Sequence, residues 1–264
     1  MFITAELVKK LRLKSGSGIM DCKKALIDSD GDINKAILLL KSKGYIKAEK
    51  KIKNIATRGV IFTYLKNRIG YMLELNCETE FVEKHVDFLN FAKKILSIAY
   101  NSKIIDVLSL KELVESKRVF LVSKFSENII LRRFCMLSGD HVSSYIHRNR
   151  IGVLVHSNCE NIILTKKIAM QIAANNPDYL DRQHIPDEFI KQEKKIQLDL
   201  AVNSGKPLLI AKKIVHGKIE KMLNNICLLE QNFIFDTEKK VKDFVLSNGI
   251  QIFKFSRFEL GEEI

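Results

Sequence analysis

The first fifty residues carry three short apolar stripes at helical spacing. The first stripe follows Thr4, a residue type that caps helices, and the second spans Met20 to Ser29. The third begins after Asp32, another capping residue, and ends at Gly44, because glycine commonly follows a helix C-terminus. The pattern therefore predicts a small module of three helices.

A β-hairpin is predicted next. Two runs rich in β-branched and aromatic residues, 60–66 and 69–76, flank the pair Asn67-Arg68 at the spacing of a tight turn. The apolar pattern then becomes helical. The further predictions for this unit are a helix from Val82 onward, a helix from about Leu110 to Lys124, and a strand over Asn128 to Met136.

Part of this unit recurs 82 residues further along the chain. The stretch NRIG at residues 67–70 returns at 149–152, and NC at 76–77 returns at 158–159. Val60 corresponds to Val142 by the same offset, and the following helix corresponds to Leu164–Asn175. Three separate matches at one offset predict two related strand-strand-helix units.

Two longer apolar stripes follow the second copy and predict an antiparallel pair of helices with charged outer faces. They are separated by residues 203–207, where Gly205 suits a helix end and Pro207 suits the first turn of the next helix. We expect this helical hairpin to project from the core. The tail from Ile250 to Leu260 alternates apolar and polar residues, which predicts a strand that closes the second unit.

The fold class predicted from these patterns is α+β. Residues 47–53 are mostly charged and offer little to bury, which indicates a linker after the N-terminal module. The predicted parts are the module with its linker at 1–54, core subdomain one at 55–139, core subdomain two at 140–183 and 226–264, and the inserted helical hairpin at 184–225.

Composition narrows the class of protein. A chain of 264 residues that is 46% hydrophobic can bury about two cores. The net charge of +13 is spread over lysines along the whole chain, so the charge alone does not establish a nucleic-acid partner. Five scattered cysteines favour a reducing, cytoplasmic compartment, and we expect neither a signal peptide nor a membrane span.

No motif predicts a catalytic or metal site. Residues 204–206 lack the spacing of a phosphate-binding loop, and the histidines between His141 and His156 match no zinc pattern. Cys77 and His85 could form a thiol–imidazole pair, but no third group is visible to orient them. The sequence therefore favours an interaction protein without a cofactor. A thiol enzyme and a basic RNA-binding or ribosome-associated protein are the alternatives.

The strand-to-helix junction of the first copy, residues 78–82, combines a carboxylate with an aromatic ring. We call this stretch the junction segment. One interpretation is that Glu80 caps a helix and Phe81 fills the core. The other is that the pair acts on another molecule. The second copy places Ile162 where the first has Glu80, so an acid is not needed to start the helix, and this favours the second interpretation.

With these residues in view, the chain resembles the elongation factor Ts family, bacterial nucleotide-exchange factors for elongation factor Tu. Four stretches carry the resemblance, in the order of the family: SGSGIMDCKKAL at 15–26 with the following GDINKAI, NCETEFVEK at 76–84, SGKP at 204–207, and FSRFELGE at 255–262. The resemblance implies a UBA-like N-terminal helical module, a core of two related subdomains and an inserted helical hairpin.

The resemblance also implies a site and a partner. Four residues match the family segment that dislodges Mg2+ from elongation factor Tu: Thr79, Glu80, Phe81 and Val82. Glu80 stands where the family usually has Asp. Four residues of the N-terminal module would dock the partner's nucleotide-binding domain: Met20, Asp21, Cys22 and Lys23. The factor would bind the GDP-bound and nucleotide-free partner and be displaced when GTP binds. Neither a membrane nor a small-molecule substrate is implied, and the positive charge would allow non-specific RNA contact.

Overall fold

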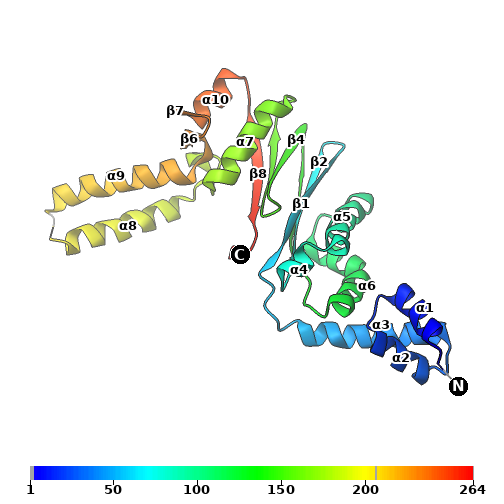
Figure 1. Cartoon of the computed structure of the whole chain (residues 1–264). Helices are drawn as coiled ribbons and strands as arrows, with labels where there is room; N and C mark the ends of the chain where they lie inside the picture. The colour runs from blue at the N-terminus through cyan, green and yellow to red at the C-terminus, as the bar shows by residue number, and fades with distance from the viewer. Residues whose placement is uncertain (1–2, 206, 264) are drawn as a thin grey trace.

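The computed structural model describes residues 3–205 and 207–263. Figure 1 shows a helical module at the N-terminus, a central pair of β-sheets with helices at their sides, and a long helical hairpin projecting from the opposite end. Helices and small antiparallel sheets form separate layers, which confirms the predicted α+β class. The UBA-like character of the module and the predicted domain boundaries stay predictions.

The N-terminal module consists of α1 (Ala5–Ser15), α2 (Ile19–Asp28) and α3 (Ile33–Lys51). Thr4 and Asp32 are N-caps, as predicted, because their side-chain oxygens accept hydrogen bonds from first-turn amides. The apolar stripes meet in a core of their own, formed by Val8, Leu11, Cys22, Ala25, Leu26, Ala36 and Leu40.

Helix α3 does not end at Gly44, and residues 47–51 are helical instead of forming a linker. The reason is packing against α6 (Val107–Phe125). A Cβ added at Gly44 would lie 3.2 Å from Val119 Cγ1, so glycine here permits close approach of two helices. Ala48 is also buried, which gives the charged stretch an apolar contact that composition alone did not reveal.

The first unit is a three-stranded antiparallel sheet with helices packed on it. Its strands are β1 (Arg58–Lys66), β2 (Ile69–Cys77) and β3 (Ile130–Ser138), in the order β1-β2-β3. Asn67 and Arg68 both have positive φ, which matches the twist of the flanking strands and confirms the predicted turn. The helices are α4 (Glu80–Glu83), α5 (Val86–Asn101) and α6. The face of α5 that carries Phe88 and Ile95 is fully buried.

The second unit repeats the order strand, strand, helix. Its elements are β4 (His141–His147), β5 (Ile151–Ser157), α7 (Ile162–Asn175) and the closing strand β8 (Ile252–Glu259), and its sheet has the order β4-β5-β8. The predictions missed the elements between the hairpin and β8: β6 (Asn232–Phe233), β7 (Asp236–Lys240) and α10 (Val241–Ser247). These elements are too short to show a clear period in the sequence.

The helical hairpin is formed by α8 (Asp187–Asn203) and α9 (Leu208–Ile226), and Figure 1 shows it extending away from the sheets. Gly205 has a φ of 77° and Pro207 immediately precedes α9, as predicted. Lys206 lies outside the described residues. Two 3₁₀ turns, Arg182–His184 and Leu228–Glu230, stand where the hairpin leaves and rejoins the second unit.

The two sheets are joined by an apolar layer and a buried ion cluster. Ile61, Met72 and Leu154 are fully buried in the layer. The carboxylate of Glu74 on β2 is also fully buried, and it accepts hydrogen bonds from Arg132 at 3.0 Å and Arg133 at 2.6 Å. The cluster extends to the C-terminal end of the second unit, because Arg133 also donates to Glu262 Oε1 and the Gly261 amide donates to Glu74 Oε1.

Replacing Glu74 with alanine would leave two arginines without their buried partner. We expect Glu74→Ala to lower the free energy of unfolding by about 3 kcal/mol, because an unpaired buried charge is costly. Urea denaturation followed by circular dichroism would measure the change. The control is Glu112→Ala on the exposed face of α6, where a change within about 0.5 kcal/mol is expected. If the Glu74→Ala and Glu112→Ala variants were equally stable, the buried Glu74 carboxylate would not be a stabilising partner of the two arginines.

Candidate functional site

Phe81 in the junction segment points into solvent. Its side chain is 75% exposed, whereas the adjacent Val82 is 1% exposed. Thr79, and not Glu80, caps α4, because the Thr79 hydroxyl accepts the Val82 amide at 3.4 Å. The interpretation of Phe81 as core and Glu80 as cap is therefore wrong. A large exposed aromatic ring on a short helix is a feature of binding surfaces.

The backbone before Phe81 is fixed by a carboxylate from a distant loop. Glu127 lies between α6 and β3, and its carboxylate accepts hydrogen bonds from the amides of Glu78 and Thr79 at 3.2 and 3.0 Å. The Thr79 hydroxyl donates to the same carboxylate at 2.6 Å. Buried Val82 anchors the other side of Phe81, so the ring is presented from a backbone that is held at both ends.

Glu80 is exposed and paired with Lys84, one helical turn away. The two side chains are 2.5 Å apart. The hydrogen bond from Lys84 lowers the pKa of Glu80, and the same bond raises the pKa of Lys84. The carboxylate is therefore ionised throughout the neutral range, and its charge would be lost only as the pH falls below the ordinary range of glutamate.

The His85 ring at the start of α5 lies near Phe81 and links it to the end of α6. The Phe81 and His85 ring centroids are 6.2 Å apart, and His85 contacts the edge of Phe125 at 4.8 Å. His85 Nδ1 accepts the amide of Asp87, and Asp87 pairs with Lys124. The hydrogen bond from Lys124 lowers the pKa of Asp87. Phe81 is thus the exposed end of a row of rings that continues through His85 to Phe125.

The arrangement does not support a thiol–imidazole pair. Cys77 is fully buried, and burial raises the pKa of its thiol to about 12. Its thiol donates to the Thr79 carbonyl, and the Nδ1 atom of His85 is occupied by the Asp87 amide. Within residues 3–205 and 207–263, no group of three or more His, Cys, Asp or Glu side chains is placed to hold a metal ion.

The four predicted docking residues of the N-terminal module do not all face solvent. Met20 is 75% exposed, and Asp21 and Lys23 are also exposed, so all three can reach a partner. Asp21 forms an ion pair with Lys47 of α3 at 3.2 Å. Cys22 is fully buried, with its sulfur 3.5 Å from the Ser15 hydroxyl, and it supports the module from inside.

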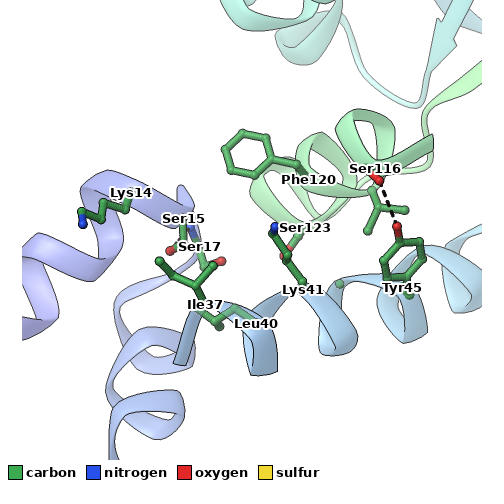
Figure 2. Close-up of a pocket in the computed structure, with 12 residues that line it drawn as sticks. Lys14, Ser15, Ser17, Ile37, Leu40, Lys41, Tyr45, Ser116, Phe120 and Ser123 are labelled. Atoms are coloured by element: carbon green, nitrogen blue, oxygen red, sulfur yellow. Dashed lines mark hydrogen bonds between the residues drawn. The ribbon is translucent and has the colours of Figure 1, made fainter. Parts of the chain in front are cut away.

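The N-terminal module is seated on α6, around a cavity of about 140 Å³ between α3 and α6. Figure 2 shows residues of both helices around this cavity and the Tyr45–Ser116 hydrogen bond of 3.2 Å. The ring of Phe120 lies over the turn after α1, since a Cβ at Gly16 would approach it to 2.8 Å. Because α6 leads into Glu127, the module and the junction segment share one supporting helix.

The second copy also exposes apolar side chains at its junction, which the sequence interpretation did not anticipate. Ile162 and Ile163 begin α7 and are 76% and 70% exposed. Asn161 caps this helix with its side-chain oxygen. The signal in the sequence was a pair of isoleucines directly after a capping residue, where charged residues are usual. The two junctions thus share exposure but differ in charge.

The fold and the site define a class of α+β protein that exposes an aromatic ring at a strand-to-helix junction. The site presents one exposed ring, one ionised carboxylate and a backbone held by hydrogen bonds, and its buried thiol, Cys77, donates to a carbonyl and not to an imidazole. None of the helices in the described ranges is long and apolar enough to cross a membrane.

Comparison with known proteins gives the family. A family model described as Elongation factor TS matches residues 78–262. The chain is 47% identical to Elongation factor Ts of Buchnera aphidicola subsp. Acyrthosiphon pisum (strain APS), over 97% of this chain and 96% of the relative. It is 43% identical to Elongation factor Ts of Cronobacter sakazakii, over 99% of this chain and 93% of the relative. The chain therefore belongs to the elongation factor Ts family, a family of translation elongation factors.

The raised pKa of Cys77 gives a test of the site. At pH 8 we expect maleimide to modify Cys77 at least about 100-fold more slowly in the folded chain than in urea, because the thiol remains protonated and buried. Peptide mass spectrometry would measure the rates. Half-buried Cys159 is the internal control and should react faster. Rapid labelling of Cys77 in the folded chain would restore the thiol-enzyme alternative.

The stability contributed by the neutral Cys77 thiol should fall as the pH rises from about 9 toward 12.

Proposed function

We propose that this chain is a guanine-nucleotide exchange factor for elongation factor Tu and that it acts in the cytoplasm without covalent chemistry. The observation that carries the proposal is the exposed ring of Phe81, held between Thr79 and buried Val82 beside the ionised Glu80. Membership of the elongation factor Ts family supports the choice of partner.

The chemistry of a bound nucleotide explains why these residue types suit exchange. A GTPase holds its nucleotide through phosphate contacts and a Mg2+ bridge. Mg2+ requires near-ideal octahedral oxygen ligands and tolerates little displacement. Phe81 would enter a pocket of the partner and displace the element behind it, while Glu80 would disturb the ligands around the metal. Loss of Mg2+ leaves the phosphate charge poorly neutralised, and GDP dissociates faster.

The residues would contribute unequally. Glu80 already forms an ion pair with Lys84, so it must exchange this partner before it can act on the metal shell. Phe81 is exposed and has no such cost. A buried aromatic anchor is typically worth at least about 2 kcal/mol, which corresponds to roughly 30-fold in rate or affinity. Thr79 and Val82 would set the geometry of the segment.

The N-terminal module would supply the second contact with the partner. Exposed Met20, Asp21 and Lys23 on α2 would contact the partner's nucleotide-binding domain, while buried Cys22 holds α2 in place. The factor would bind the GDP-bound and nucleotide-free partner. Thermodynamic linkage then requires that a factor which weakens nucleotide binding is itself weakened by nucleotide, so GTP would displace it.

Release of a fluorescent GDP analogue from elongation factor Tu tests the proposal. We expect Phe81→Ala to slow factor-stimulated release by about 30-fold and Glu80→Gln to slow it less, because the ring provides the anchor. Low Mg2+ should reduce both defects. The matched control is Ile163→Ala, which removes an equally exposed apolar side chain from the second copy and should leave the rate unchanged. If wild type does not accelerate release, the proposed function is wrong.

RNA binding is a second candidate function, because the charge is less evenly distributed than the sequence pattern suggested. Residues 1–54 contain 13 Lys and Arg but 6 Asp and Glu, which accounts for +7 of the +13. Lys50 and Lys51 lie in the last turn of helix α3, where their positive charges complement the helix dipole. A single-stranded RNA could bind such a module through its phosphates.

A salt titration separates this candidate from exchange. If the module binds RNA, the dissociation constant of a labelled RNA oligomer should rise steeply with salt. In a plot of the logarithm of the binding constant against the logarithm of the salt concentration, Lys9→Gln with Lys10→Gln should then make the slope shallower by about 0.7 for each RNA phosphate that is no longer neutralised. The control is Lys194→Gln with Lys195→Gln on α8, which are equally exposed. Equal slopes for both double variants would show that the charge of the module has no specific role.

A further inference from the structure

Phe81 can act as a wedge only if the backbone that carries it does not yield, and the residues that prevent this come from far along the chain. Glu127 uses both carboxylate oxygens. Oε2 accepts the amides of Glu78 and Thr79, and Oε1 accepts the Thr79 hydroxyl at 2.6 Å. Hydrogen bonds to an ionised acceptor are about twice as strong as neutral ones.

Thr79 transmits this restraint to α4. Its hydroxyl donates to Glu127 and accepts the amide of Val82, so one side chain both receives the external anchor and caps the helix. Val82 is 1% exposed and fixes the next residue after Phe81. The ring therefore lies between two immobilised neighbours, and little conformational freedom remains to be lost on binding.

A second carboxylate ties the same segment to the end of α3. Glu78 Oε1 accepts the amide of Asn128 at 2.6 Å and the side chain of Asn54 at 2.9 Å. The Asn128 side chain donates in turn to the carbonyls of Ile52 and Asn54, at 3.3 and 2.8 Å. Helix α3 ends at Lys51, so these bonds connect the N-terminal module directly to the junction segment.

We infer that Glu127 is a positioning residue for Phe81, and that Asn54, Glu78 and Asn128 couple the N-terminal module to the junction segment. The inference rests on the proposed function, because positioning matters only if Phe81 enters a partner. A displacement of α2 when it docks would be transmitted to Phe81 through α3 and these hydrogen bonds, in addition to any transmission through the apolar core. We call Asn54, Glu78 and Asn128 the coupling residues.

A double-mutant cycle tests the role of Glu127. Two quantities are measured: the maximal rate of GDP release from elongation factor Tu, and the concentration of the factor that gives half of this rate. They are compared for wild type, Phe81→Ala, Glu127→Ala and the double variant. Glu127→Ala should lower the maximal rate by about 10-fold and by no more than the roughly 30-fold expected for Phe81→Ala, because a misplaced wedge loses its geometry. In the Phe81→Ala background it should cost almost nothing. If the two losses multiply, Glu127 acts elsewhere and the inference is wrong.

Controls distinguish positioning from loss of fold. Glu127→Gln keeps the size of the side chain and one acceptor oxygen, so it should show an intermediate loss that also disappears without Phe81. Glu112→Ala removes an exposed carboxylate of α6 and should change neither value. A Glu127→Gln variant as active as wild type, with normal stability, would contradict the need for two acceptor oxygens.

Amide hydrogen exchange gives a readout that does not depend on the partner. Glu127→Ala and Asn54→Ala should each accelerate exchange in the peptide covering residues 76–84, while the β4–β5 region stays unchanged. Asn90→Ala, an exposed asparagine of α5, is the matched control for Asn54. Suppose that wild type fails to accelerate GDP release but amide hydrogen exchange in residues 76–84 responds as stated. The proposed function is then wrong, while the inferred coupling between the module and the junction segment is supported. Unchanged exchange in both variants would overturn the inference.

Discussion

The buried carboxylate of Glu74 is the constraint on which the arrangement of the molecule depends. It sits on the central strand of the first unit, yet the Gly261 amide, which donates to it directly, lies 187 residues further along the chain, and Arg133 links it to Glu262. A buried charge must be paired, and Arg132 and Arg133 of β3 pair with Glu74, while the residues just after β8 add further hydrogen bonds to the same cluster. These bonds connect the two sheets, and Figure 1 shows the N-terminal module beside the first unit and the helical hairpin extending from the second, at opposite ends.

The junction segment uses the rigidity that this core provides. Cys77 before the segment and Val82 at its end are buried, whereas Thr79, Glu80 and Phe81 are exposed. Rigid elements hold a binding group more accurately than loops do, since less freedom is lost when the partner arrives. The exposed ring costs little stability because its neighbours, and not the ring itself, make the packing contacts.

The duplication shows how one backbone plan can carry different surfaces. Both copies start a helix after the second strand, with a capping side chain and two exposed residues. The first copy exposes Glu80 and Phe81, while the second exposes Ile162 and Ile163. A cap and a buried anchor are enough to form the junction, so the exposed positions are free to change. The two copies therefore share a fold while presenting different surfaces, and a function is carried by such surfaces and not by the fold.

The sequence by itself determined the elements whose signals are local: the caps Thr4 and Asp32, the Asn67-Arg68 turn, the hairpin break at Gly205, the strand–helix repeat and the family motifs. Spacing between neighbours in the chain decides these features. The tertiary structure alone decided that α3 continues past Gly44, that Cys22 faces inward, that Phe81 faces outward, and that Glu127 fixes the segment behind it. Those outcomes depend on contacts between residues far apart in the chain, such as Gly44 with Val119 and Thr79 with Glu127, and no local pattern encodes which partner will be present.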